Sequence, residues 1–431
     1  MMNNRYCFKE LANNSSVVYD RLTKKTLLLK GQFNDVKLEY EKKVFIPTIE
    51  DTQFSTFVLS ITDQCNLRCK YCSRYHGDYK PNDMTPEMMS NIISSILKYA
   101  SRIGEKCVVQ FHGGEPTIRY RTIMDVLHNF DKKLLLEAID FRIQTNCTNF
   151  PDEFLDFCRE YHIQIGISLD GPASVTDALR KNSTGNGITK EVLNNIKRIK
   201  LRVPESSISC LCVVTKKSIE SAEEIFDFMI KHDIDDVSFL PLYNDYSCIN
   251  DDSSIIPRND ELLEFSKKII DKWIAYLKSG KVVCIPNFQI WFWNLIANNT
   301  DKYYDTHSCC GMGETILFID KDGAIYPCGP FSYESKMAFA KVVNDHFDFD
   351  TLRESHLFSM IKSRLPDECA DCALQGICKC GCAANAYLKY KTIDSRDPYC
   401  DYWNGIITYM LQILISNPDI IDLIPDYTIR V

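Results

Sequence analysis

Short apolar runs alternate with longer amphipathic segments between residues 57 and 279. The apolar runs are rich in Val, Ile, Leu and Phe, which is typical of strands buried in a parallel sheet. They predict strands at residues 57–62, 107–112, 141–146, 164–169, 208–215 and 237–242. The amphipathic segments repeat their apolar positions at helical spacing. They predict helices at residues 85–101, 151–161, 189–200, 218–232 and 259–279.

This alternation predicts an α/β fold built from repeated βα units. Six such units with right-handed crossovers form a partial (β/α)6 barrel instead of the closed eight-unit form. Ligands of parallel sheets bind at the carboxyl ends of the strands, where the loops lie. The segments that directly follow the predicted strands are therefore the first candidates for a site.

Two further regions flank the predicted barrel, which takes residues 53–300. Residues 1–52 contain two β-like runs, 16–19 and 26–29, and the polar segment between them predicts a hairpin. Residues 301–431 are dense in cysteine. We therefore expect an N-terminal hairpin segment, a partial barrel and a cysteine-rich domain.

Composition and charge narrow the function classes. The chain has 431 residues, 45% hydrophobic and 25% charged, as in ordinary globular proteins. A net charge of −8 without a dense Lys/Arg block argues against sequence-independent binding of nucleic acid. The apolar stretch 405–415 is too short to span a bilayer. Residues 1–16 lack the apolar core of a signal peptide, so we expect a cytoplasmic protein with no membrane partner.

Twenty cysteines are present, and most lie in tight clusters, which favours metal binding over a disulfide framework. Cys65, Cys69 and Cys72 follow the first predicted strand at CxxxCxxC spacing. Three thiolates are too few to close a tetrahedral metal site, but they can hold a cubane iron–sulfur cluster and leave its fourth iron open. The alternatives are a CxxC knuckle for structural zinc, or cysteines that are simply buried.

The CxxxCxxC motif resembles that of the radical S-adenosylmethionine (SAM) superfamily. The resemblance implies that the open iron holds the amino and carboxylate groups of SAM, and that reductive cleavage gives a 5′-deoxyadenosyl radical, which abstracts hydrogen from a substrate. It implies cofactor contacts at the ends of several strands. These residues are Tyr71 near the adenine, Gly113, Gly114 and Glu115 at the amino group, Ser168 at the ribose and Arg180 at the carboxylate.

Three of these segments also have simpler interpretations. The glycine pair before Glu115 could form an ordinary turn. Arg180 stands at DxxR spacing from Asp177, so the two could form a surface ion pair. We expect Asp170, in Ser-Leu-Asp-Gly-Pro, to order its own turn.

The tail resembles the SPASM domain, which carries two auxiliary 4Fe-4S clusters. The shared pattern is a cysteine, then G-x4-C, then CxxCx5Cx3C and a last cysteine. The resemblance implies an outer cluster held by Cys369, Cys372, Cys378 and Cys400. It implies an inner cluster held by Cys310, Cys328 and Cys382, with Cys309 as an additional candidate. With the cluster at Cys65, Cys69 and Cys72, this makes three 4Fe-4S clusters.

The eighth ligand and the role of Cys380 stay open. If Cys309 cannot reach the inner cluster, that cluster has an open iron, which could bind a substrate thiolate or take up an electron. Cys380 is interpreted as a spare, packed cysteine. A zinc ribbon is the alternative for the whole tail.

Three functions remain in view. The first is a maturase that modifies a ribosomally made precursor peptide, by a thioether or other crosslink or by epimerisation. The second is a sulfatase-maturing enzyme, in which an aspartate follows the cysteine of G-x4-C as a base; here Gly329 follows Cys328, and no general base is identified. The third is a non-catalytic iron–sulfur or zinc scaffold.

The first reading also implies partners. An electron donor such as flavodoxin or ferredoxin would reduce the clusters. The N-terminal hairpin could add a leader peptide as a strand to its edge, or it could cap the end of the barrel.

Overall fold

The computed structural model describes residues 6–11, 15–21, 25–30, 53–72, 82–204, 206, 208–242, 253–297 and 310–425. The chain divides into two compact units. Unit 1 combines residues 1–51, 257–311 and 363–431, and unit 2 combines residues 52–256 and 312–362.

Unit 2 is built on a nine-stranded sheet of order β12-β11-β10-β4-β5-β6-β7-β8-β9. The strands from β4 to β9 are all parallel to their neighbours. They are β4 (Thr56–Thr62), β5 (Cys107–Gly113), β6 (Ile139–Thr145), β7 (Gln164–Ser168), β8 (Ile208–Val214) and β9 (Val237–Pro241). All six predicted strands are confirmed, and so is the mixed α/β fold with a mostly parallel sheet.

The alternation of side chains explains why these residues form strands. In β5, β6 and β8 every second residue is buried, whereas β4 is buried almost throughout. The rings of Phe111 and Phe141 stack across β5 and β6 at 5.9 Å between centroids. Burial of such aromatic side chains dominates the stability of a core.

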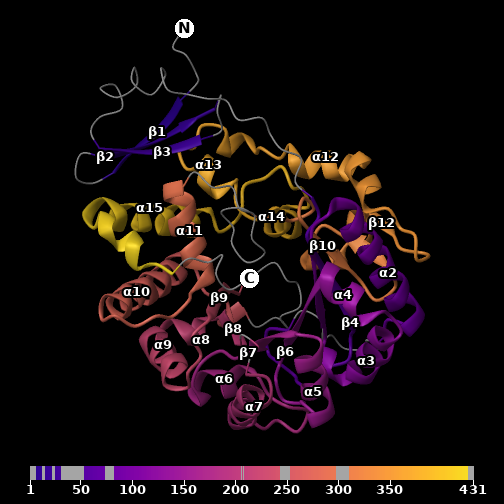
Figure 1. Ribbon diagram of the computed structural model, residues 1–431. Coiled ribbons are helices and arrows are strands. Elements are labelled where there is room, and N and C mark those ends of the chain that lie inside the picture. The colour runs from indigo at the N-terminus through magenta and orange to yellow at the C-terminus, as the bar shows by residue number, and fades with distance from the viewer. Residues whose placement is uncertain are drawn as a thin grey trace. The chain divides into compact units, whose positions relative to one another are not determined.

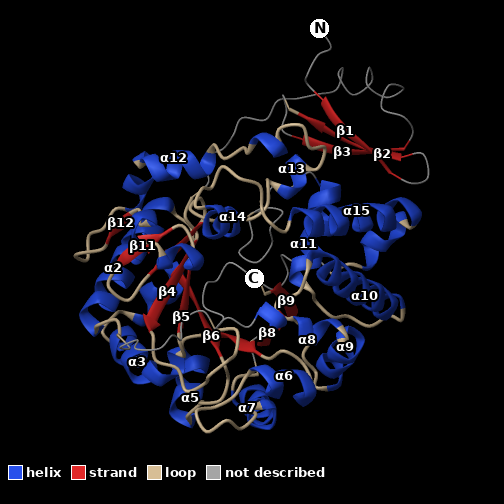
Figure 2. Ribbon diagram, turned by 180° about the vertical axis from the view of Figure 1, so that it is seen from behind, coloured by secondary structure: helices blue, strands red, loops and turns tan. Residues whose placement is uncertain are grey.

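Helices cover the outer side of this sheet, as Figure 2 shows for α3 to α9 along β5 to β9. α2 begins after Thr85, whose side chain accepts a hydrogen bond from Met88 N, and it ends at Gly104 in a left-handed conformation. The helices are α2 (Pro86–Ile103), η1 (Pro116–Arg119), α3 (Tyr120–His128), α4 (Lys132–Ala138), α5 (Asp152–Glu160), α6 (Ala173–Leu179), α7 (Thr189–Arg202), α8 (Lys216–Ile219), α9 (Ala222–Lys231), η2 (Ser253–Ile255), η4 (Gly329–Tyr333), η5 (Ser335–Met337), η6 (Phe349–Glu354) and α12 (His356–Lys362).

Three short strands that the sequence pattern did not predict extend the sheet beyond β4. β10 (Ile316–Ile319) pairs parallel with β4, and β11 (Ala324–Tyr326) and β12 (Ala340–Lys341) follow antiparallel. Unit 2 therefore takes its sheet from two stretches of chain that are far apart in the sequence.

Unit 1 contains an antiparallel sheet of order β1-β2-β3 and a set of helices. The predicted hairpin corresponds to β2 (Ser15–Asp20) and β3 (Lys25–Lys30), and β1 (Tyr6–Leu11) adds a strand that was not predicted. The helices are α10 (Asn259–Lys278), α11 (Pro286–Ala297), η7 (Asp367–Cys369), α13 (Gln375–Cys378), α14 (Ala383–Tyr390), α15 (Cys400–Ser416) and η8 (Pro418–Leu423).

Two contacts hold unit 1 together. α10 packs on α15, where Ser266 Oγ lies 3.0 Å from Tyr402 OH. The N-terminal sheet lies beside α13 (Figure 1), and Cys7 and Tyr19 form a buried cluster with Ala373. The hairpin segment is thus packed against the cysteine-rich segment of its own unit.

The units do not follow the predicted domain boundaries. Residues 257–300 group with the tail, and residues 312–362 group with the barrel strands. That the chain has three functional parts, a hairpin segment, a barrel and a cluster domain, stays a prediction. Among the residues described, no helix is long and apolar enough to cross a membrane.

Candidate cofactor site

Cys65, Cys69 and Cys72 lie in the loop that follows β4, and all three are partly exposed. Backbone hydrogen bonds tie this cysteine loop to the segment after α6. Arg68 N donates to Lys181 O at 2.7 Å, and Lys70 N donates to Leu179 O at 2.9 Å. The loop therefore has a fixed shape on a second element of unit 2.

Burial disfavours the thiolate forms of Cys65 and Cys69, although the Arg180 guanidinium counteracts this at Cys69. Burial raises the pKa of the Cys65 thiol to about 11 and that of Cys69 to about 12, and the neighbouring cysteines add to both shifts. Leu67 N donates to Cys65 Sγ at 3.4 Å, which is the kind of contact that supports a metal-bound thiolate. Three converging thiols with an N–H donor fit a 4Fe-4S cluster with one open iron.

No three His, Cys, Asp or Glu side chains of the described residues are arranged as ligands of a single metal ion. A cubane cluster makes a different demand, because each thiolate binds its own iron. The donor set after β4 therefore matches a cluster better than a mononuclear ion.

The glycine pair at the end of β5 lies directly against the backbone that leads into Cys65. Gly114 N donates to Thr62 O at 2.6 Å. A Cβ atom on Gly114 would lie 2.2 Å from Gln64 O. Gly113 has a φ of +145°, and a Cβ atom there would likewise clash with Thr62 O. Only glycine allows this approach, so the pair fixes the start of the cysteine loop.

Glu115 is fully buried, and its carboxylate is engaged by the chain. Oε1 accepts from Thr117 N at 3.0 Å and from the Thr117 and Thr145 hydroxyls at 2.7 Å, and Oε2 accepts from Asn146 N at 2.6 Å. Burial raises the pKa of Glu115, and these hydrogen bonds oppose that shift. The carboxylate thus joins the ends of β5 and β6.

Asn146 continues this connection to the cysteine loop. Its Nδ2 donates to Asn66 Oδ1 at 2.8 Å and lies 3.9 Å from Cys65 Sγ. Asn66 Nδ2 in turn donates to Thr148 Oγ1 at 2.8 Å. The sequence predicted a strand at residues 141–146 but indicated no such role for Asn146.

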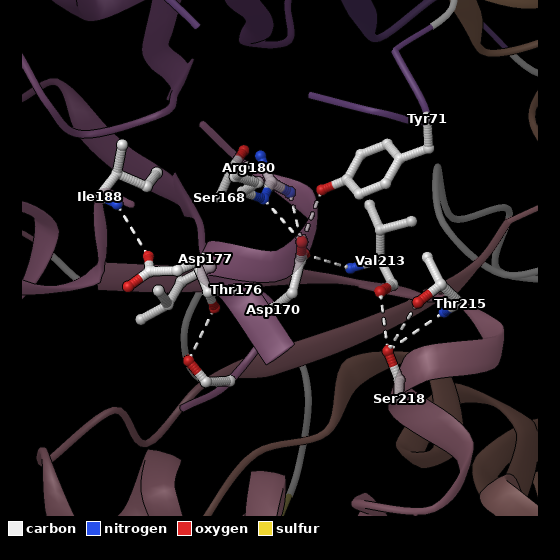
Figure 3. Close-up of polar contacts among 12 residues, drawn as sticks. Tyr71, Ser168, Asp170, Thr176, Asp177, Arg180, Ile188, Val213, Thr215 and Ser218 are labelled. Carbon is white, nitrogen blue, oxygen red and sulfur yellow. Dashed lines mark hydrogen bonds and ion pairs between the residues drawn. The ribbon is translucent and has the colours of Figure 1, made fainter. Parts of the chain in front are cut away.

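A buried ion pair forms the opposite side of the site (Figure 3). Arg180 donates to Asp170 through Nε at 2.8 Å and through Nη2 at 3.0 Å. Tyr71 OH donates to Asp170 Oδ2 at 2.6 Å, and Val213 N donates to Oδ1 at 2.9 Å. Asp170 therefore collects donors from the cysteine loop, α6 and β8, a role that the sequence reasoning missed.

The charges in this cluster stabilise one another. Burial alone would lower the pKa of Arg180, but the Asp170 carboxylate raises it well above the usual value. Burial raises the pKa of Tyr71 well above its usual value, although the nearby guanidinium opposes the shift. The Arg180 guanidinium lies 5.3 Å from the centre of the Tyr71 ring, which adds a cation–π contact.

Two other predicted residues have separate surroundings. Asp177 does not pair with Arg180; its Oδ1 accepts from Ile188 N at 2.8 Å and from Thr189 N at 2.9 Å at the start of α7 (Figure 3). Arg180 is only 6% exposed, so the alternative of a surface ion pair is wrong. Ser168 Oγ is half-buried and accepts from Gln144 Nε2 at 3.1 Å.

The tail cysteines of unit 1 influence one another electrostatically. Burial is the main cause of the raised pKa of Cys378, and Cys400 and Cys372 add to it. Burial likewise raises the pKa of Cys382, with a contribution from Cys310. Cys378 therefore lies near Cys372 and Cys400, as the predicted outer cluster requires, and Cys382 lies near Cys310, as the predicted inner cluster requires. The role of these cysteines as ligands stays a prediction.

Three further cysteines need separate mention. Cys328 belongs to unit 2, and Cys309 lies outside the described residues. Cys380 is buried, and a hydrogen bond with the Cys369 thiol lowers its pKa to about 7. Cys380 is therefore packed beside the outer group.

Comparison with known proteins bears on this site. Residues 59–229, from β4 to α9, match the model of the Radical SAM superfamily. The cysteine-type anaerobic sulfatase-maturating enzyme of Clostridium novyi is 27% identical over 368 residues, which cover 80% of this chain and 92% of that protein. The radical SAM cyclopropyl synthase TigE of Paramaledivibacter caminithermalis is 24% identical over 436 residues, which cover 95% and 85%.

A solved structure shows the same fold. It is native anSMEcpe with bound AdoMet and the Cp18Cys peptide, which superposes with a TM-score of 0.72 at 21% identity. The alignment covers 84% of this chain and 98% of that one.

Proposed function

We propose that this enzyme is a maturase that modifies a ribosomally made peptide, by a thioether or another crosslink, because residues 59–229 match the model of the Radical SAM superfamily. The observation that carries the radical chemistry is the cysteine loop, fixed between the glycine pair of β5 and the segment after α6. The resemblance of the tail to SPASM domains and the peptide bound in the anSMEcpe structure support a peptide as the substrate.

Cys65, Cys69 and Cys72 would hold a 4Fe-4S cluster with one open iron. When bound, the cluster and SAM supply a 5′-deoxyadenosyl radical that abstracts hydrogen from the substrate. Glu115 fixes the strand ends beside the cysteine loop, and Gly113 and Gly114 bring the backbone to it.

Arg180 would bind the SAM carboxylate through the part of its guanidinium that does not donate to Asp170. Its Nε and Nη2 donate to Asp170, and among the described residues no hydrogen bond engages Nη1. The Nη1 group is therefore the donor that Arg180 offers to the cofactor. Tyr71, held by the same carboxylate, offers its ring, and Ser168 offers its hydroxyl to the ribose.

The crosslinking reaction is favoured over formylglycine formation by the segment after Cys328. Cys328 precedes η4, which begins with Gly329 and Pro330, so no carboxylate follows this cysteine as a proton acceptor. TigE, a relative that aligns with 95% of this chain, is named a cyclopropyl synthase, and forming a cyclopropyl ring requires a new bond in the substrate.

Sulfatase maturation is the second candidate, because the Clostridium novyi relative carries that name at 27% identity. Both candidates use the same radical site. They differ in the mass of the modified peptide, so mass spectrometry distinguishes them.

Two auxiliary clusters complete the proposal. Cys369, Cys372, Cys378 and Cys400 would hold the outer cluster, and Cys310, Cys328 and Cys382 the inner one, with Cys309 as an additional ligand or with one iron open. The auxiliary clusters would accept the electron left after bond formation. A flavodoxin or ferredoxin would supply the electron for SAM cleavage.

Iron analysis with Mössbauer spectroscopy tests the clusters. We expect about twelve irons in the anaerobically reconstituted chain and about eight when Cys65→Ala, Cys69→Ala and Cys72→Ala are combined. About four irons falling to none would contradict the auxiliary clusters.

Product analysis separates the two candidates. A peptide encoded beside the gene, incubated with enzyme, SAM and dithionite, should lose two hydrogen atoms when a crosslink forms. A formylglycine in a cysteine-containing sulfatase peptide would instead support the second candidate.

A further inference from the structure

We propose that Asp397 is a positioning residue shared by the two auxiliary clusters: it holds one ligand segment of each and sets a fixed negative charge between them. This inference rests on the cluster assignment in the proposed function. The contacts from which it is argued all lie within unit 1.

The Asp397 side chain is 1% exposed and accepts three hydrogen bonds. Oδ2 accepts from Cys382 N at 2.7 Å and from Trp403 Nε1 at 2.9 Å. Oδ1 accepts from Tyr399 N at 2.9 Å. Three donors converge on two oxygen atoms, a demand that a carboxylate meets and a side-chain amide cannot fully meet.

The backbone of Asp397 binds the other ligand segment. Cys400 N donates to Asp397 O at 2.9 Å, at the start of α15. The same residue thus fixes Cys382, assigned to the inner cluster, and Cys400, assigned to the outer cluster.

Gly381 shows how closely these segments are fitted. Its φ is +69°, and a Cβ atom would lie 2.4 Å from Asp397 Cβ and 2.6 Å from Oδ2. Any other residue would push the carboxylate away from Cys382. Glycine at 381 is therefore explained by Asp397.

Arg364 fastens the turns around this carboxylate without neutralising it. Its guanidinium donates to the carbonyl oxygens of Cys380 at 3.1 Å, Ile393 at 2.6 Å and Ser395 at 2.8 Å. Among the described residues no Lys or Arg forms an ion pair with Asp397. The carboxylate is therefore held by neutral N–H donors and not by a cationic side chain.

The charge reaches the thiols on both sides. Cys382 N donates to the Asp397 carboxylate and Cys400 N donates to its backbone carbonyl, so the charge lies beside an assigned ligand of each cluster. A nearby negative charge makes addition of an electron to a cluster less favourable, so it lowers the reduction potential. Asp397 should therefore hold both auxiliary clusters at lower potential.

The test is Asp397→Asn in the full chain that also carries Cys65→Ala, Cys69→Ala and Cys72→Ala, so that only the auxiliary clusters contribute. Anaerobic redox titration followed by EPR should show both potentials shifted upward relative to the parent. Asp394→Asn removes the same charge from an exposed position three residues before Asp397, and it should shift neither potential appreciably because water screens it. A shift of one cluster alone, or of neither, would overturn the proposal.

Loss of iron is also decisive. If Asp397→Asn folds by circular dichroism but loses the iron of both clusters, the shared positioning role is supported; loss of about four irons of about eight contradicts it. If it does not fold, Trp403→Phe removes a single donor to the carboxylate. That variant should alter both EPR signals, and an alteration of one or none would overturn the proposal.

The parent protein separates this inference from the proposed function. About eight irons in the parent establish the auxiliary clusters before Asp397 is changed. A parent without iron would contradict both the auxiliary clusters and the role of Asp397. Normal iron content with unchanged reduction potentials in Asp397→Asn would contradict only the role of Asp397.

Discussion

At the scale of the residue, Asp170 decides the shape of the cofactor site. Its two oxygens accept hydrogen bonds from Tyr71, Arg180 and Val213, and its side chain is completely buried. A guanidinium buried with its partner is stable, but a guanidinium buried alone is costly. The side chain that the sequence reasoning assigned to a local turn is therefore the partner on which Arg180 depends.

Asp170→Asn should lower the free energy of unfolding by about 3–5 kcal/mol, because it leaves the buried Arg180 charge unpaired. SAM binding should weaken as Tyr71 and Arg180 lose their common anchor. Urea unfolding and anaerobic calorimetry with SAM measure the two effects.

Asp177→Asn is the matched control, because that carboxylate binds the start of α7 and not Arg180. It should cost about 1 kcal/mol of stability and leave SAM affinity unchanged. Equal SAM affinity in Asp170→Asn and the parent would contradict the role given to Asp170.

The residue scale also shows what could be read from the sequence. Motif spacing placed Cys65 after β4 and Gly114 after β5, where the structure has them, whereas Arg180 follows helix α6. Spacing suggested Asp177 as the neighbour of Arg180, whereas the structure pairs Arg180 with Asp170. A helix-capping carboxylate and an ion-pair carboxylate look alike in a sequence, because their partners come from distant segments.

At the scale of the element, the N-terminal sheet is fitted to the cysteine-rich segment. Cys7 Sγ contacts Ala370 O at 3.7 Å, and Arg21 Nε donates to Cys7 Sγ at 3.2 Å. Arg21 also pairs with Asp371. The β1-β2-β3 sheet thus covers the segment between Cys369 and Cys372, where the outer cluster is proposed.

Cys7→Lys should loosen this packing, because it puts a second cation beside Arg21 in a buried position. Hydrogen exchange followed by mass spectrometry should then show faster exchange in residues 369–373. Phe8→Lys is the control on the same strand, since Phe8 is 61% exposed. Similar exchange in the two variants would contradict the packing role of Cys7.

The elements differ in how far the sequence predicts them. Strands β4 to β9 were predicted because each is a distinct apolar run between helices. β1 and β10 to β12 were missed, since they are short and their pairing partners lie elsewhere in the chain. β10 pairs with β4 across more than 250 residues, as Phe318 opposite Val58 shows, and local pattern carries no information about such a partner.

At the scale of the molecule, the ligands proposed for the cleaving cluster and those proposed for the outer auxiliary cluster belong to different compact units. Cys69 belongs to unit 2, and Cys372 belongs to unit 1. Cys69→Ala should abolish formation of 5′-deoxyadenosine, because the cleaving cluster is lost. Cys372→Ala should retain part of that cleavage but stop formation of the modified peptide.

Chromatography of 5′-deoxyadenosine and mass spectrometry of the peptide follow the two activities separately. Cys158→Ala changes a buried cysteine outside every proposed ligand group, and it should retain both. Equal loss of cleavage and product in Cys372→Ala would mean that the tail serves only as structure.

The order of the segments in unit 1 bears on how the protein is made. The contact between Cys7 and Ala370 spans 363 positions, so a ribosome that adds about 5–20 residues per second exposes β1 roughly 20–70 seconds before its partner emerges. During that interval Cys7 and Tyr19 lack Ala373, with which they form a buried cluster. The nascent chain is therefore a natural client of chaperones, and the proposed outer cluster could be assembled only after Cys400 has been translated.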